Sequence, residues 1–271
     1  MREAAKRCVA YPAGIVHPLA LPTLLALIAA AFFAGAVDAI GGGGGLIMVP
    51  ALLAAGLPPQ LALGTNKGQS VFGSLTALIR FARGGLVDGR VARVTFPAAF
   101  LGALGGSALV LVLKPEVLRP VVLVLLVAAA VLVTVMRPRS SEGARPARAG
   151  VLPIAGTIAV LVGAYDGFFG PGSGTFYIAG FVGLLGLSMA RASADAKVAN
   201  FASNLAAAAL FAQRGVIVWA IALPLAGGQI LGGFLGAHLA VRRGDRLVRA
   251  VVLAVVLALV LKVGRDLYLA R

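Results

Sequence analysis

The sequence predicts an all-α fold: a polytopic transmembrane helical bundle of two homologous halves, with about 8–10 segments. Composition is the first reason, because 60% of the residues are hydrophobic, only 12% are charged and the mean hydropathy is +1.00. A soluble domain carries about a quarter charged residues. Segment length is the second reason. Residues 19–37, 94–113 and 216–241 contain no Asp, Glu, Lys or Arg, and roughly 20 apolar residues suffice to cross a bilayer.

An internal repeat is the third reason. Shifting the sequence by 130 residues aligns its two halves. Alanine- and leucine-rich segments align by chance, but matched Lys, Gly and Asp residues rarely do. We therefore expect a first transmembrane repeat in residues 1–136, a basic linker loop in 137–150 and a second transmembrane repeat in 151–271. The matches include Lys67 with Lys197, Gly102 with Gly232, Gly106 with Gly236 and, with the offset shortened by two, Asp38 with Asp166.

Each half contains five apolar segments. The second segment of each half has only about 12 residues, too few to span a bilayer alone, and it follows a cluster of glycines. Short, Gly- or Pro-interrupted segments at matching places in two halves indicate a binding site. The expected segments are Leu19–Val37, Leu46–Leu57, Leu61–Ile79, Val94–Leu113 and Pro120–Met136, then Val151–Tyr165, Thr175–Leu187, Ala190–Phe211, Val216–Val241 and Leu247–Val263.

The relative direction of the halves has two readings. If the short segments are re-entrant, each half crosses four times and the halves are parallel. If they cross, each half crosses five times and the halves are inverted. The basic loops fit neither arrangement fully. We favour inversion, because discontinuous helices usually accompany it.

The formal net charge of +15 comes mostly from arginines in short connections, as the positive-inside rule requires of a membrane protein. No basic stripe interleaved with aromatics points to nucleic acid. Cys8 is the only cysteine, so no intramolecular disulfide forms. We find no motif for a catalytic residue, a metal site or a cofactor, and we predict that the protein is not an enzyme.

Two glycine-rich stretches, Gly41–Gly45 and Gly170–Gly174, each precede a short segment. Neither has the surroundings of a nucleotide-binding loop. Glycine lets the backbone approach a ligand closely, and the helix start beyond it offers N–H groups to an anion. Close helix crossing through small residues explains the same glycines equally well. On the first reading, the anion-binding candidates are Gly43, Gly44, Gly45, Gly172, Ser173 and Gly174.

A polar stripe occurs in each half. Lys67, Ser70 and Ser74 share one helical face, and the repeat places Lys197, Asn200 and Asn204 at the same spacing. Ionisable residues inside membrane segments are costly and usually face a cavity or a partner. Snorkelling of the lysines to an interface is the alternative. We expect both stripes to bind substrate, with Thr65 and Asn66 adding polar groups in the first half.

Asp38 and Asp166 each come just before a glycine stretch. Three roles are open for them: pairing with Lys67 and Lys197 in the empty protein, taking up a coupling proton, or fixing the glycine loop by accepting its N–H groups. We favour the last role slightly.

The sequence resembles the TauE/SafE sulfite-exporter-like family of membrane transporters over about residues 20–265. Asp195, two residues before Lys197, departs from the small or Thr-rich residues expected there and would lower the local positive field. The resemblance rests on Asp38 with Gly41–Gly45, on Gly56-Leu57-Pro58-Pro59 and Gly64-Thr65-Asn66-Lys67, on the stretch from Tyr165 to Phe176, on Lys197-Val198-Ala199-Asn200 with Ser203-Asn204, and on Gly232 with Gly236-Ala237.

The resemblance implies a multi-pass protein of the bacterial inner membrane that exports small sulfur-containing anions such as sulfite, sulfoacetate or other organosulfonates. It would be a secondary transporter with its substrate bound between the two halves, with proton coupling and a homodimer both open. The alternatives are a facilitative, channel-like anion pathway or, less favoured, a membrane-embedded enzyme or scaffold.

Overall fold

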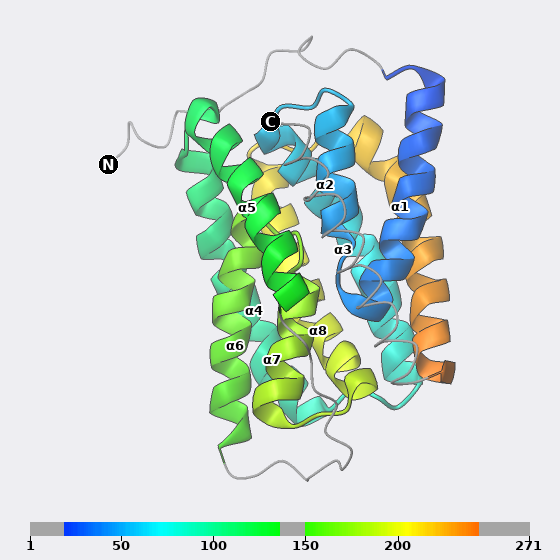
Figure 1. Cartoon of the computed structure of the whole chain (residues 1–271), viewed down its shortest axis with the longest axis vertical. Coiled ribbons are helices and arrows are strands. Elements are labelled where there is room, and N and C mark those ends of the chain that lie inside the picture. Colours follow the sequence, from blue (N-terminus) through cyan, green and yellow to red (C-terminus); the bar gives the residue numbers. More distant parts are fainter. Residues whose placement is uncertain (1–18, 136–149, 244–271) are drawn as a thin grey trace.

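The computed structural model describes residues 19–135 and 150–243. All regular secondary structure in these two ranges is helical, and the helices lie roughly along one axis (Figure 1). The expected all-α bundle is confirmed. The 137–149 part of the linker and the expected segment Leu247–Val263 lie outside the described residues.

The first half contributes five helices. Prolines begin several of them, because a missing N–H costs nothing in the first helical turn. Pro115 begins the fifth helix in this way, five residues before the expected start at Pro120. The Asp88 side chain accepts the N–H of Arg90 and so caps the fourth helix. The helices are α1 (Leu21–Gly41), α2 (Gly45–Ala54), α3 (Pro59–Arg83), α4 (Gly89–Val112) and α5 (Pro115–Val135).

The second half follows the same order: α6 (Val151–Phe168), α7 (Ser173–Leu185), α8 (Met189–Gln213) and a last described helix, Trp219–Arg243. Within the described ranges, four helices are long and apolar enough to cross a membrane by length and composition: α1, α4, α6 and Trp219–Arg243. The second helix of each half, α2 or α7, is short, as the sequence predicts.

Contacts between α3 and α8 show that these two corresponding helices run in opposite directions. Near the start of α3, Thr65 accepts the N–H of Val218, just beyond the end of α8. Near the start of α8, Asp195 accepts the N–H of Asp88, just beyond the end of α3. Each helix therefore begins where the other ends.

Glycines pair the remaining long helices across the two halves. On α4, a Cβ added to Gly102 or Gly106 would overlap backbone oxygens of α6, at Val160 and Ala164. On the last helix, a Cβ on Gly232 would overlap Phe32 of α1 in the same way. Close backbone approach through small residues is typical of membrane helix pairs. The first helix of each half thus packs against the fourth helix of the other half.

These pairings fix the relation of the two halves. The helices α4 and α6 run in the same direction, because their contacts advance together along both chains. The same holds for α1 and Trp219–Arg243, whose Gly228 and Gly236 face Ile28 and Ala36. Since α3 and α8 are antiparallel, corresponding helices of the two halves point in opposite directions. The structure therefore has the favoured inverted arrangement, but not for the expected reason. The short helices α2 and α7 fold back against the preceding helices α1 and α6, so the expected link between re-entrant segments and parallel halves is wrong.

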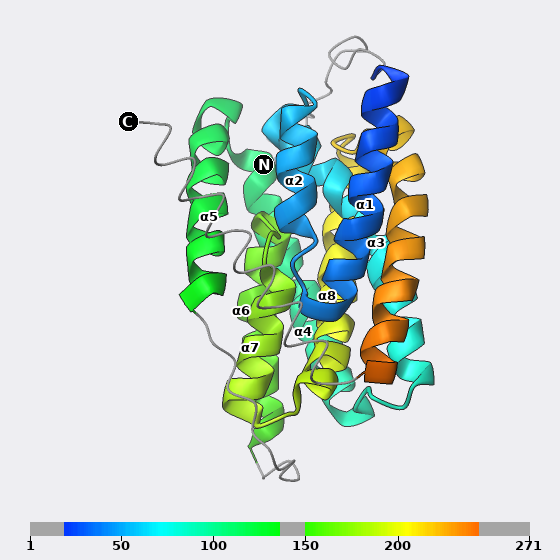
Figure 2. The same cartoon turned by 45° about the vertical axis from the view of Figure 1, so that its right-hand side comes forward.

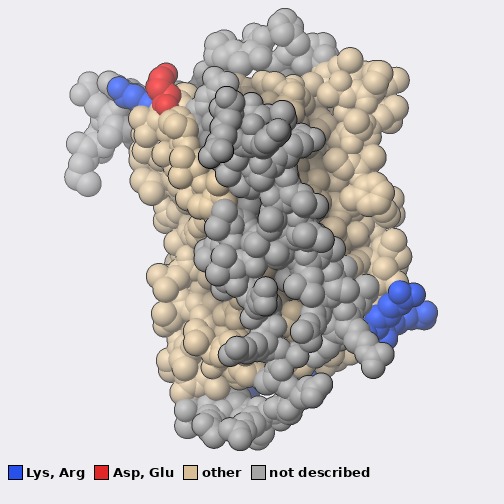
Figure 3. Space-filling model, viewed as in Figure 1, with Lys and Arg blue, Asp and Glu red and all other residues tan. Residues whose placement is uncertain are grey.

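The short helices make two hairpins, α1–α2 and α6–α7, that enter the bundle from opposite ends (Figures 1 and 2). Their glycine turns touch in the interior, where a Cβ on Gly42 would overlap the backbone of Gly174. On the face drawn in Figure 3, the described surface shows charged side chains only toward its two ends. If the middle of the bundle lies in the hydrocarbon core, no water is available there. Polar groups buried in it therefore need partners from within the protein.

Candidate functional site

Lys67 lies on α3 and points into the contact between the two halves. Its Nζ is 2.7 Å from Oδ1 of Asp166, near the end of α6, and 3.0 Å from Oδ1 of Asn204 on α8. The Lys67 and Asp166 side chains are only 3% and 2% exposed. Lys67 does not snorkel, because its charge is neutralised inside the bundle.

Lys197 forms the matching pair from the other half. Its Nζ is 2.6 Å from Oδ2 of Asp38, near the end of α1, and 3.3 Å from Oδ1 of Asn200. The Lys197 side chain has no exposed surface, whereas that of Asp38 is 21% exposed. Both ion pairs are crossed: the lysine of each half meets the aspartate of the other.

Asp166 collects several donors around the first pair. Ser173, the first residue of α7, donates to Oδ1 at 2.7 Å. Ser203 donates to Oδ2, and Asn200 donates to the same oxygen at 3.4 Å. Asn204 in turn donates to Asn200 at 3.4 Å, so one hydrogen-bond network connects the two ion pairs. A buried carboxylate is tolerated when its oxygens are satisfied in this way.

Hydroxyls of the second half also cover the end of α1. The last carbonyls of a helix lack partners within the helix. Thr175 donates to the carbonyl oxygen of Gly41 at 2.7 Å, and Ser193 donates to that of Ile40 at 2.9 Å. The Asp38 carboxylate therefore stands beside a helix end that the other half holds in place.

Comparison with known proteins gives a family. A model described as "Sulfite exporter TauE/SafE" matches residues 27–263. The chain belongs to the TauE/SafE family. It is 38% identical over 235 residues to "Probable membrane transporter protein YfcA" of Escherichia coli K12, covering 87% of this chain and 86% of that protein.

Other relatives of this TauE/SafE chain have similar names. It is 37% identical to "Probable membrane transporter protein ORF9" of Sinorhizobium, with 86% and 89% of the two chains covered. It is 38% identical to a "Probable membrane transporter protein" of Haemophilus influenzae, with 85% and 90% covered. No solved structure matches significantly. The protein is a multi-pass membrane transporter, and its relatives are named as transporters rather than enzymes.

The predicted polar stripes are brought together only in part. Lys67, Lys197, Asn200, Asn204 and Ser173 meet in the network with Asp38 and Asp166. Ser74 instead donates to the carbonyl of Ser70 on its own helix at 2.8 Å. Thr65 is engaged by the N–H of Val218, and Asn66 accepts from Gln69. The side chains of Thr65, Asn66 and Ser74 are buried and have partners outside the ion pairs.

The glycines of the TauE/SafE chain serve close packing at several predicted positions. Gly174 meets Gly42, and a Cβ on Gly45 would lie 3.1 Å from Cα of Pro171. A Cβ on Gly44 would lie 2.6 Å from Cβ of Asp38. At Gly170 the space is taken by the ion pair itself, since a Cβ there would lie 2.9 Å from Nζ of Lys67. The backbone thus approaches both charged pairs directly.

Ser203 lies one residue before Asn204, beside the predicted stripe, and it joins the network through Asp166. Two other residues, Thr175 and Tyr177, were absent from the predicted set. Thr175 sits directly after the second glycine stretch, and its position in a small-residue cluster was the available signal. Tyr177 of α7 is fully buried, and its hydroxyl meets the geometric criteria of a hydrogen bond with none of the described residues. No motif distinguishes Tyr177 from an ordinary apolar core residue.

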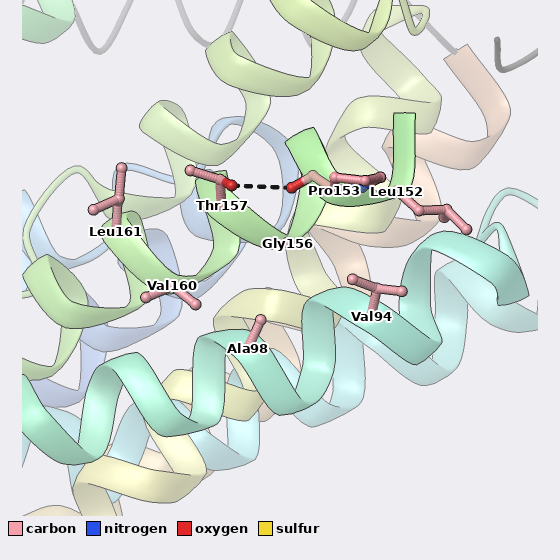
Figure 4. A pocket seen from close by; sticks show the side chains of 8 residues that line it. All are labelled: Val94, Ala98, Leu152, Pro153, Gly156, Thr157, Val160 and Leu161. Carbon is pink, nitrogen blue, oxygen red and sulfur yellow. Dashed lines mark hydrogen bonds between the residues drawn. The ribbon is translucent and has the colours of Figure 1, made fainter. Parts of the chain in front are cut away.

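A separate groove of about 620 Å³ lies between α4 and α6 (Figure 4). Its lining is apolar apart from Thr157, whose hydroxyl donates to the carbonyl oxygen of Pro153 at 3.0 Å. Leu161 at its rim is 65% exposed. The described residues that line this groove carry no charge, so the buried lysines remain the candidate site for an anion.

Proposed function

We propose that the protein is a secondary transporter that exports small sulfur-containing anions, such as sulfite, sulfoacetate or other organosulfonates, across the bacterial inner membrane. The substrate would bind where the two halves meet, beside Lys67 and Lys197. The observation that carries the proposal is the burial of two lysines at the contact of two inverted halves. Intramembrane charges of this kind mark substrate pathways.

Further support comes from the chemistry around the lysines. Ser173, Asn200 and Asn204 supply hydrogen-bonding side chains next to the ammonium groups. The start of α7 at Ser173 adds the positive end of a helix dipole, which favours an oxyanion. The family description names sulfite, which has the three oxygens that such a set of donors would bind.

The ion pairs also suggest how transport would work. Two lysines and two aspartates leave the site without net charge. An arriving anion must therefore separate at least one lysine from its carboxylate. Both lysine side chains are nearly inaccessible, so a local opening has to come first. This sequence of events fits a carrier better than an open pore.

The test is anion flux in proteoliposomes. Sulfite, sulfoacetate, thiosulfate, sulfate and chloride would be measured with and without a pH gradient. We expect selective movement of a sulfur oxyanion or sulfonate, which Lys67→Ala or Lys197→Ala abolishes. Exposed Lys114, at the α4–α5 turn, provides the control variant Lys114→Ala. Flux that both lysine variants retain would remove them from the mechanism. No flux of any anion by folded wild-type protein would refute the proposed cargo.

A further inference from the structure

The two ion pairs differ in how their carboxylates are held. Asp166 accepts hydrogen bonds from four side chains: Lys67, Ser173, Ser203 and Asn200. Within the described part of the chain, the Asp38 carboxylate has one donor, Lys197. The Asp38 side chain is 21% exposed, against 2% for Asp166. Inverted symmetry therefore relates the two aspartates by position but not by surroundings.

This difference decides which aspartate is able to gain a proton. A protonated carboxyl group must donate through one of its oxygens, whereas both Asp166 oxygens already accept from two donors each. Protonating Asp166 would leave buried donors without acceptors, which is costly. Protonating Asp38 breaks only its contact with Lys197, and its exposed part gives a proton access.

We propose, on the basis of the function above, that Asp38 is the proton-coupling carboxylate and that Asp166 stays ionised throughout the cycle. A bound monoanion replaces Asp38 at the Lys197 ammonium. The Asp38 carboxylate takes one proton from water at the same time and becomes neutral. The charges then balance as before: the anion against Lys197, and Asp166 against Lys67. One proton moves with each monoanion in either direction, so export is driven by an outward gradient of the substrate itself. The buried site never holds an uncompensated charge.

Other ionisable groups near Asp38 are engaged or distant. The helix α2 carries no charged residue. The ionisable group of α7 is the Tyr177 phenol, and Lys67 of α3 is held by Asp166. His238 of the last helix accepts a hydrogen bond from Arg80 of α3. Among the residues that the structure describes, Lys197 on α8 is therefore the charged group paired with Asp38.

The first experiment is transport of ethanesulfonate and sulfite into proteoliposomes, with an internal dye that reports pH. Ethanesulfonate remains a monoanion near neutral pH, so a proton that moves with it must travel on the protein. For one proton per anion, a gradient of about one pH unit drives about tenfold accumulation. We expect wild type to approach this value and Asp38→Asn to lose accumulation while still exchanging anion across the membrane. The carboxylate-retaining variant Asp38→Glu should still accumulate anion.

A second measurement needs no variant to fold. Calorimetric titration of wild type with ethanesulfonate, in buffers of different ionisation enthalpy, should show uptake of about one proton per bound anion. Binding without proton uptake would overturn the assignment, as would accumulation by Asp38→Asn equal to that of wild type. In both cases the transport function would still stand. Absence of any binding or flux in wild type would instead remove the proposed function and the coupling with it.

Discussion

The Asp195 carboxylate accepts the backbone N–H of Asp88 at 2.8 Å and so ties the start of α8 to the α3–α4 turn of the other half. Its counterpart at the 130-residue offset is Thr65, which accepts the N–H of Val218 at 3.1 Å. The two residues do the same work at opposite ends of the bundle. Asp195 therefore anchors the α3–α4 turn through a hydrogen bond, a role different from the expected lowering of the positive field at Lys197.

This equivalence makes Asp195→Thr a conservative change. Asp195→Ala should lower the free energy of unfolding by about 1–3 kcal/mol, because the Asp88 N–H loses its acceptor. Asp195→Thr should recover most of that loss, since a hydroxyl does the same task at Thr65. Thermal unfolding in detergent measures both. Equal midpoints for wild type and Asp195→Ala would contradict this role.

The buried Lys67–Asp166 pair should show strong energetic coupling. Lys67→Met or Asp166→Asn alone should destabilise the fold by about 3–5 kcal/mol, because each leaves a partner buried without its counter-charge. The double variant should lose less than the sum of the two single losses. Chemical unfolding of the four proteins measures the cycle, with exposed Lys114→Met as the control. Additive losses would mean that the two groups do not stabilise each other.

Contact between the two hairpin turns should be intolerant of even one methyl group. A Cβ on Gly174 would lie 2.5 Å from Cα of Gly42, so Gly174→Ala must push the hairpins apart. Gly183, on the same helix, has nothing within 4 Å of an added Cβ, and Gly183→Ala is the matched control. We expect Gly174→Ala to lose flux and thermal stability while Gly183→Ala keeps both. Similar behaviour of the two variants would show that the turns do not need to touch.

One end of the bundle carries most of the described basic residues. The Asp195–Asp88 bond places the start of α8 beside the α3–α4 turn, and the Arg80–His238 bond places the last helix there too. Lys114 and Arg214 lie at the opposite turns. The basic residues at the first end are Arg80, Arg83, Arg90, Arg93, Arg191, Arg242 and Arg243.

The positive-inside rule therefore predicts that the α3–α4 turn faces the cytoplasm. After Cys8→Ser, single cysteines at exposed Gly89 and Gln213 would be tested in intact cells with a membrane-impermeant maleimide. We expect labelling at position 213 without cell disruption, and at position 89 only after disruption. The reverse pattern would invert the assigned orientation.

Much of the fold follows from the sequence because membrane segments must be apolar and glycine clusters must interrupt them. The matched lysines, the short second segments and the glycine turns were all visible in this way. The crossed pairing was not, because an offset between Lys67 and Lys197 says nothing about which aspartate each one reaches. Inversion was favoured from the sequence, but it was decided by contacts between α3 and α8, such as Thr65 with Val218, which show that these corresponding helices are antiparallel.

The different hydrogen-bond surroundings of Asp38 and Asp166 could not be predicted from the sequence repeat. Ser203, which donates to Asp166, has Gly73 as its counterpart at the 130-residue offset, and Gly73 has no side chain to offer. The repeat therefore predicts two similar sites. In the structure, the Asp166 carboxylate accepts hydrogen bonds from four side chains, whereas among the described residues the Asp38 carboxylate accepts from Lys197 alone. Departures from symmetry are set by single side chains, and a sequence pattern shows them only after the contact is known.

The crossed pairs also bear on how the chain is made. Asp166 follows Lys67 by 99 residues, and Lys197 follows Asp38 by 159. At typical synthesis rates of about 5–20 residues per second, the first half waits about 5–20 seconds for the Asp166 carboxylate. During that interval the Lys67 ammonium and the Asp38 carboxylate have not yet met their final partners. Among the site residues, each is the only opposite charge that the other could find. Both crossed pairs can form only after residues of the second half have been made, so the charged centre of the bundle is completed late in synthesis.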